Sequence, residues 1–252
     1  MARGQQQAAQ AASVPVVPRG IYTRAFGYKL SVPVASRGEY ASEILDITFT
    51  NSSQIADDFV DEIYESSASF IGFDLEHRPT YRPGQKANIS LLQFAAPSSR
   101  DRSTHPVLVY SIYHDSGKIP DSLEYLLRDP RIEKYGVGIR GDVKHLRYLN
   151  MDQDARDSFK ELAPIAFQKG LVDRPTIGLK ALIAATMGEE CTAYKTQSLT
   201  MTNWELPEFS TAQLKYAAMD AFAGLEIWQL LDGWKTSNAM RQNQEVSSDS
   251  SY

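Results

Sequence analysis

The feature that most limits the fold of this chain is the order of its apolar segments. Three strand-like runs follow one another without a helix between them, at Phe70–Glu76, Ile89–Ala95 and Val107–Ile112. Helix-like and strand-like runs then alternate. A helix with apolar residues four apart also precedes the first of these strands. This order predicts an α/β domain built on a mixed sheet with helices packed against it.

Composition narrows the class of protein. The chain has 252 residues, of which 42% are hydrophobic and 23% charged, so we expect one domain with a sizeable core and additional tails. Cys191 is the sole cysteine, which excludes an intramolecular disulfide and fits a reducing compartment. No apolar run approaches ~18 residues, so no membrane span is expected.

The two ends differ from the middle of the chain. Residues 1–42 contain no acid before Glu39, and we expect either a disordered leader or a targeting segment there. The targeting reading would direct the chain to the mitochondrion, whereas the disordered reading leaves the nucleus or cytoplasm open. Residues 236–252 are polar and predict a disordered tail. The folded domain is therefore expected at 43–235.

A pair of acids lies in the first of the three strands. Side chains of a strand alternate between its faces, so Asp74 and Glu76 project together while Ile71, Phe73 and Leu75 share the opposite face. Two carboxylates this close repel each other unless a cation lies between them. Hard divalent ions prefer such oxygen ligands. Taken alone, the pair is also compatible with the solvated face of an ordinary edge strand.

Two further acids occupy positions that favour a site. Asp142 follows an apolar strand and a glycine turn, at the first turn of a predicted helix. Tyr216 and Asp220 are four residues apart in the last predicted helix, so their side chains point into the same space. Each feature has a structural explanation by itself, as a helix cap or a solvent-facing pair.

The order of these signals resembles that of the DEDDy 3′–5′ exonuclease family, and within it the Werner-syndrome-type exonuclease domain. The resemblance covers roughly residues 69–231. It is carried by five stretches, IGFDLEHRP, ISLLQFA, YGVGIRGDVKHL, TNW and LKYAAMDAFAGLEIW. It implies an RNase H-like fold, with a mixed sheet of five to six strands and helices on both faces.

The resemblance also implies a reaction. The chain would release nucleoside 5′-monophosphates from a 3′ end of single-stranded or 3′-recessed DNA or RNA, using two Mg²⁺ or Mn²⁺ ions. Tyr216 would orient the attacking water with the help of Glu76. The metal ligands implied are Asp74, Glu76, Asp142 and Asp220.

Substrate contacts follow from the same matches. Leu75 and Leu92 would wedge against the last base, and His77 stands where relatives often carry an aromatic residue. Lys195 and Trp204 match family positions near the active site. Thr200, however, occupies a position that is usually basic in Werner-type domains, and Pro164 one that is usually polar. The net charge of −5 argues against tight, non-specific binding of duplexes over the whole surface.

One alternative function remains open at this point. The chain could be a catalytically weak exonuclease-like module that binds nucleic acid or acts as a scaffold in a larger complex. The survival of the four acids and of Tyr216 favours the enzyme, because degenerate relatives usually lose one or more of them.

Overall fold

A computed structural model describes residues 26–34, 41–79, 88–98, 104–115 and 117–249 of the chain. One mixed sheet forms its centre, with strand order β1-β2-β5-β4-β3-β6-β7. Its strands are β1 Phe26–Val34, β2 Ala41–Thr50, β3 Phe70–His77, β4 Ile89–Ala95, β5 Thr104–Ser111, β6 Glu133–Gly136 and β7 Phe159–Glu161.

The sheet is mixed because β1 and β4 run against their neighbours. β4 pairs antiparallel with both β3 and β5, and β1 pairs antiparallel with β2. The other pairs, β2 with β5, β3 with β6 and β6 with β7, are parallel. The carboxyl ends of β2, β5, β3, β6 and β7 therefore meet at one edge of the sheet.

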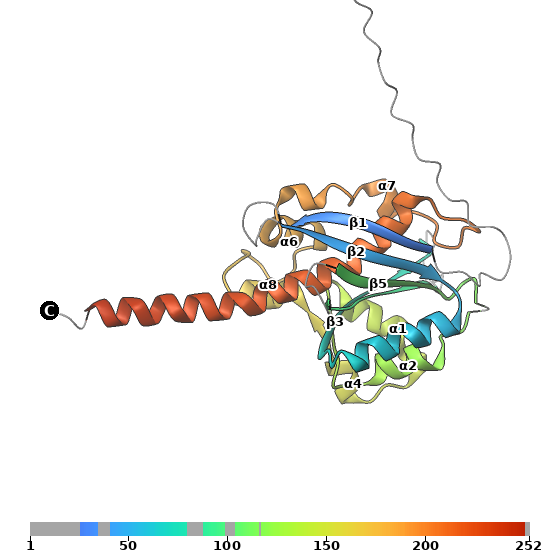
Figure 1. Cartoon of the computed structure of the whole chain (residues 1–252), viewed down its shortest axis with the longest axis horizontal. Helices are drawn as coiled ribbons and strands as arrows, with labels where there is room; N and C mark the ends of the chain where they lie inside the picture. The colour runs from blue at the N-terminus through green and yellow to red at the C-terminus, as the bar shows by residue number, and fades with distance from the viewer. Residues whose placement is uncertain (1–25, 35–40, 80–87, 99–103, 116, 250–252) are drawn as a thin grey trace, which may run out of the picture.

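Helices cover both faces of the sheet (Figure 1). One apolar cluster joins β2, β4 and β5 to the face covered by α5, α6 and α8. A second cluster joins the opposite face to α1, α2, α3 and α4. The helices are α1 Ser53–Glu65, α2 Asp121–Arg128, α3 Ile139–His145, α4 Gln153–Asp157, α5 Leu162–Gln168, α6 Leu179–Thr186, α7 Gln197–Thr200 and α8 Thr211–Asp249, with 3₁₀ turns η2 Arg147–Leu149 and η3 Glu189–Thr192.

Helix α8 lies unusually close to the sheet. A Cβ atom added to Gly72 of β3 would lie 1.9 Å from the carbonyl oxygen of Ala221, and one added to Gly224 would lie 2.4 Å from that of Tyr135. Only glycine permits this backbone approach at both positions. The start of α8 is fixed by a capping box, in which the Gln213 N–H donates to Ser210 Oγ and the Ser210 N–H donates to Gln213 Oε1.

The structure differs from the sequence-based expectation at both ends. Residues 26–34 form β1 within the segment predicted as a leader, because apolar residues alternate there and pair with β2 along nine positions. The sheet has seven strands as a result. Residues 1–25 and 35–40 lie outside the described residues.

At the other end, α8 continues to Asp249, where a disordered tail was predicted from residue 236 onward. The stretch contains Ala, Met, Arg, Gln and Glu and lacks Pro and Gly, so a helix that has already started can propagate through it. In Figure 1 this part of α8 extends away from the rest of the molecule. Within the described residues, no helix combines the length and apolarity needed to cross a membrane.

Candidate active site

The strand β3 presents Asp74 and Glu76 to the face covered by α8. The alternation predicted from the sequence is observed, because Phe73 and Leu75 are buried in the cluster on the opposite face. Asp220 lies on α8 immediately before Ala221, the residue that packs against Gly72 of β3. The close approach of this helix to the strand therefore brings Asp220 beside the acid pair.

Three acids form a compact group. Asp74, Glu76 and Asp220 each offer one carboxylate oxygen, and these oxygens lie within 4.8 Å of one another. Asp142, in α3 beyond the carboxyl end of β6, lies outside this group of three. It is close enough that its charge is the largest cause, after burial, of the raised pKa of Asp74.

Burial and mutual repulsion make ionisation of these acids costly. Burial is the first cause of the raised pKa in each of them. Repulsion from Asp220 adds to the effect at Glu76. For Asp142, burial and then repulsion from Glu161 raise the pKa to about 7. A group of ionised oxygens in this setting favours a divalent cation, which relieves the repulsion and accepts oxygen ligands.

Tyr216 lies one turn before Asp220 and is buried. Its hydroxyl donates to Thr200 Oγ1 at 3.2 Å, and the Thr200 hydroxyl donates in turn to the carbonyl of Thr196. Burial is the first cause of a pKa above the ordinary tyrosine value. The phenol therefore keeps its proton at neutral pH. Thr200, which departs from the family pattern, holds this phenol in place.

The irregular segment before α7 adds two contacts that the sequence did not predict. The Tyr194 hydroxyl donates to Asp220 Oδ1 at 2.9 Å, and Lys195 Nζ donates to Asp220 Oδ2 at 2.5 Å. Lys195 Nζ also lies 4.5 Å from the centre of the Tyr216 ring. The sequence offered one indication that Tyr194 lies in the site, namely that it directly precedes Lys195.

Trp204 is fully buried, so it supports the site from beneath and presents no surface to a substrate. Its ring packs near Tyr216, with centroids 6.0 Å apart. Burial raises the pKa of Glu76, and the indole N–H of Trp204 opposes this rise by favouring the ionised form. The predicted direct contact with substrate is therefore replaced by a supporting role.

The predicted contacts of Leu75 and Leu92 with the last base do not fit this structure. The two residues are paired in the β3–β4 register and both belong to the cluster on the face away from the carboxylates. Gln93, the next residue, pairs with Asp74 instead and is fully buried. Neither polar atom of its amide has a hydrogen-bond partner among the described residues. Gln93 is thus a polar neighbour of the acid pair.

His77 stands at the end of β3, where it is half-buried. Its ring lies against that of His145 in α3, with centroids 4.9 Å apart and the planes inclined by 33°. His77 directly follows Glu76 in the sequence. Its position is compatible with the predicted contact to a nucleotide.

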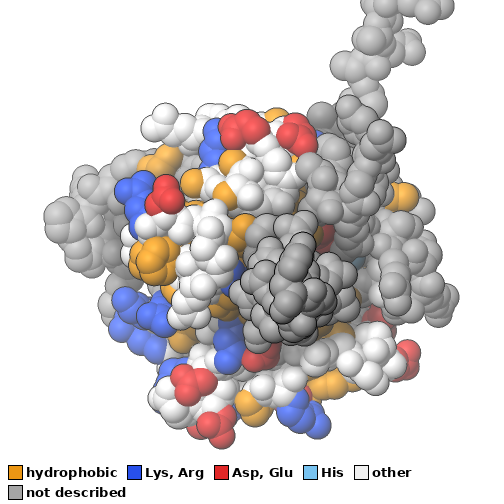
Figure 2. All heavy atoms as spheres, turned by 90° about the vertical axis from the view of Figure 1, so that its left-hand side faces the viewer, with side chains coloured by type: hydrophobic (Ala, Val, Ile, Leu, Met, Phe, Trp, Pro, Cys, Tyr) orange, Lys and Arg blue, Asp and Glu red, His pale blue; other side chains and the backbone are white. Residues whose placement is uncertain are grey.

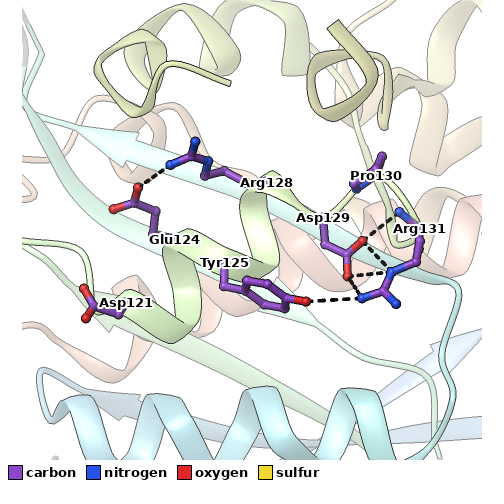
Figure 3. Close-up of a pocket in the computed structure, with 7 residues that line it drawn as sticks. All are labelled: Asp121, Glu124, Tyr125, Arg128, Asp129, Pro130 and Arg131. Atoms are coloured by element: carbon purple, nitrogen blue, oxygen red, sulfur yellow. Dashed lines mark hydrogen bonds and ion pairs between the residues drawn. The ribbon is translucent and has the colours of Figure 1, made fainter. Parts of the chain in front are cut away.

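A second pocket in the molecule lies away from the group of carboxylates. A pocket of about 690 Å³ lies at the end of α2 and is lined by side chains of both charges. Figure 3 draws these side chains. Its central acid, Asp129, accepts hydrogen bonds from Arg131 at 2.7 Å and from Tyr64 at 2.9 Å. α2 belongs to the cluster on the face away from the carboxylates. The pocket therefore lies apart from the candidate site.

Comparison with protein families gives a match over most of the domain. A family model described as 3'-5' exonuclease matches residues 47–233. The mouse bifunctional 3'-5' exonuclease/ATP-dependent helicase WRN is 34% identical over 168 residues, which are 66% of this chain and 11% of that protein. A 3'-5' exonuclease of Arabidopsis thaliana is 31% identical over 168 residues, 66% of this chain and 54% of that protein.

The chain thus spans about half or less of the length of these curated relatives. Solved structures share its fold at low identity. Escherichia coli RNase D matches with a TM-score of 0.57 at 16% identity, over 77% of this chain and 46% of that one. The EXO domain of Aedes aegypti Nibbler matches with a TM-score of 0.56 at 19% identity, over 75% and 88%. These likenesses confirm the expected RNase H-like fold.

Proposed function

The chain belongs to the 3'-5' exonuclease family, and from that premise we propose that it removes nucleotides one at a time from the 3′ end of a nucleic acid with the help of two divalent ions. The observation that carries this proposal is the group of Asp74, Glu76 and Asp220, whose oxygens lie within 4.8 Å of one another. The family match supports the type of reaction, and the grouping of the three carboxylates supports the location of the active site.

The donor set fits Mg²⁺ or Mn²⁺. All four predicted ligands are carboxylates, which these hard ions prefer, and sulfur or imidazole ligands are missing from the group of three. When bound, two such ions supply a hydroxide near neutral pH and stabilise the negative charge that develops on the leaving 3′ oxygen. Asp74, Glu76 and Asp220 would hold one ion, and Asp142 would share the second with Asp74.

Tyr216 acts on the attacking water. Its pKa is raised above the ordinary value, first by burial, so the hydroxyl remains a neutral donor and acceptor at neutral pH. In the structure its hydroxyl donates to Thr200 Oγ1. We propose that the hydroxyl exchanges this contact for the water when substrate is bound, with Glu76 as the second group that orients it.

We expect the substrate to be bound near the active site and not over the whole surface of the protein. The chain has a net charge of −5, and the face in Figure 2 carries acidic and basic side chains interspersed with apolar ones. Such a surface does not attract phosphates along its whole extent. We propose that single-stranded or 3′-recessed ends are the substrates, since a free 3′ end can reach a largely enclosed group of carboxylates, of which Asp74 and Glu76 are partly exposed, and the interior of a duplex cannot.

The test uses strands labelled at the 5′ end, with matched DNA and RNA sequences in single-stranded and 3′-recessed form. Stepwise shortening with Mg²⁺ or Mn²⁺, release of nucleoside 5′-monophosphates and inhibition by EDTA are expected. Asp74→Ala should stop the reaction, and a blocked 3′ end should resist it. Binding of these strands without cleavage by the wild-type protein would favour the alternative of a binding module.

A further inference from the structure

Lys195 makes the shortest contact in the site. Its ammonium lies 2.5 Å from Asp220 Oδ2, with 13% of the lysine side chain and 3% of the aspartate side chain exposed. Tyr194 donates to the other oxygen of the same carboxylate. Both oxygens of Asp220 therefore accept hydrogen bonds from side chains of this chain.

These contacts distinguish Asp220 from the other acids. In the part of the chain that the structure describes, Lys195 is the basic side chain that forms an ion pair with the group of Asp74, Glu76 and Asp220. One ammonium cannot neutralise three or four carboxylates. It does, however, occupy Oδ2 of Asp220, one of the three acids that could together hold a metal ion.

We propose that Lys195 is an internal counter-ion of the site, which competes with a divalent cation for Asp220 and, once displaced, contacts the phosphate of the bound strand. This inference rests on the proposed function, because it assumes that Asp220 is a metal ligand. An ammonium and a divalent ion on the same carboxylate repel each other, so each weakens the binding of the other.

The surroundings of Lys195 allow such a movement. Its ammonium lies over the face of Tyr216, which keeps favourable contact with a cation as the side chain pivots. Lysine carries its charge on a flexible four-carbon stem with three rotatable donors, so it can exchange one anionic partner for another. The phosphate of a substrate near Tyr216 provides that second partner.

The first test measures metal affinity without any turnover. Mn²⁺ is titrated into the substrate-free protein and the free ion is followed by electron paramagnetic resonance. Lys195→Met should bind Mn²⁺ about tenfold more tightly than wild type, because the competing charge is gone. Lys195→Arg should return the affinity toward that of wild type. Lys215→Met is the matched control, since Lys215 is exposed on α8 and its loss changes net charge equally.

Whether Lys195→Met binds Mn²⁺ more tightly or more weakly than wild type decides between the inference and its rejection. Unchanged or weaker Mn²⁺ binding by Lys195→Met would overturn the inference while leaving the proposed function intact. A wild-type protein that binds no Mn²⁺ would remove the proposed function itself. At saturating Mn²⁺, Lys195→Met should turn over substrate at least about fivefold more slowly, because the lysine no longer meets the phosphate.

A second test needs no variant. The wild-type protein is pulsed with acetic anhydride, with and without saturating Mn²⁺, and the acetylation of each lysine is measured by mass spectrometry. Release from Asp220 should increase the labelling of Lys195 severalfold, while Lys215 serves as the internal reference. Equal labelling of Lys195 under both conditions would overturn the inference even if Lys195→Met failed to fold.

Discussion

Asp220 and Asp129 are both buried aspartates that accept a hydrogen bond from a tyrosine hydroxyl and form an ion pair with a basic side chain. Tyr194 and Lys195 contact Asp220 at 2.9 and 2.5 Å. Tyr64 contacts Asp129 at 2.9 Å. Arg131 contacts the same carboxylate at 2.7 Å (Figure 3). Their pKa values are nevertheless shifted in opposite directions.

The difference lies in what surrounds each carboxylate. Burial raises the pKa of Asp220 despite its two donors. Hydrogen bonds from Arg131 are the first cause of the lowered pKa of Asp129, although burial opposes them. Asp220 shares its surroundings with Asp74 and Glu76, whereas Asp129 belongs to no such group among the residues that the structure describes. Asp220, which lies beside two other acids, is therefore suited to binding a cation. Asp129, which is neutralised by Arg131, is suited to stabilising the fold.

The largest expected effect separates the two aspartates by activity. Asp220→Asn should reduce exonuclease turnover by roughly a thousandfold or more, because a metal ligand is lost. Asp129→Asn should leave turnover within about threefold of wild type, since it lies on the other side of the sheet. Single-turnover rates on one labelled strand measure both. More than a tenth of wild-type activity in Asp220→Asn would contradict the assignment of this ligand.

The tyrosines give a second contrast. Tyr216→Phe should lower turnover about 100-fold with little change in the affinity for the strand, because the hydroxyl acts on the attacking water. Tyr64→Phe removes the hydroxyl that contacts Asp129 and should leave turnover unaltered. Rapid-quench rates and a separate binding titration distinguish the two effects. Equal losses in affinity and turnover for Tyr216→Phe would remove its role in orienting the water.

The positions of the acids could be predicted from the sequence because they depend on local geometry. Strand alternation places Asp74 and Glu76 on one face, and the helical repeat places Tyr216 beside Asp220. The same alternation argues against Leu75 as a contact to the last base, and the structure confirms that it lies on the opposite face.

The surroundings of Asp220 could not be predicted in this way. Tyr194 and Lys195 lie 26 and 25 residues before it, in a segment without regular periodicity. Their contacts depend on how that segment folds over α8, for which the sequence carries no repeating signal. The pairing of β1 with β2 was missed for a different reason, since a period-two pattern was present but read as part of a leader.

The stability of the two sites should respond oppositely to pH in EDTA. Burial and then repulsion from Glu161 raise the pKa of Asp142 to about 7, above the value of about 4 in an unfolded chain. Its ionisation therefore costs stability as pH rises from about 4 to about 7. Asp142→Asn should raise the melting temperature at pH 8 by about 4 °C, with a smaller gain at pH 5.

Asp129→Asn is the matched control for that experiment. Because the folded-state pKa of Asp129 is lowered, its contribution to stability is present above about pH 4 and is lost only at lower pH. The variant should be less stable by about 2 kcal/mol at both pH 5 and pH 8. A lower melting temperature for Asp142→Asn at pH 8 would contradict the electrostatic account of the site.

The smallest effect on stability is expected from a substitution of Arg131. It tests whether the strength of the ion pair depends on burial of the basic side chain. Seventy-one per cent of the Arg131 side chain is exposed, against 13% for Lys195. Water and salt screen an exposed pair, and Asp129 would keep its contacts with Tyr64 and with the Arg131 backbone N–H. Arg131→Gln should therefore lower the melting temperature by no more than about 2 °C, and 1 M NaCl should erase the difference. A larger loss that persists in salt would show that the exposed ion pair resembles the buried one, and the contrast between the two aspartates would then depend on neighbouring acids alone.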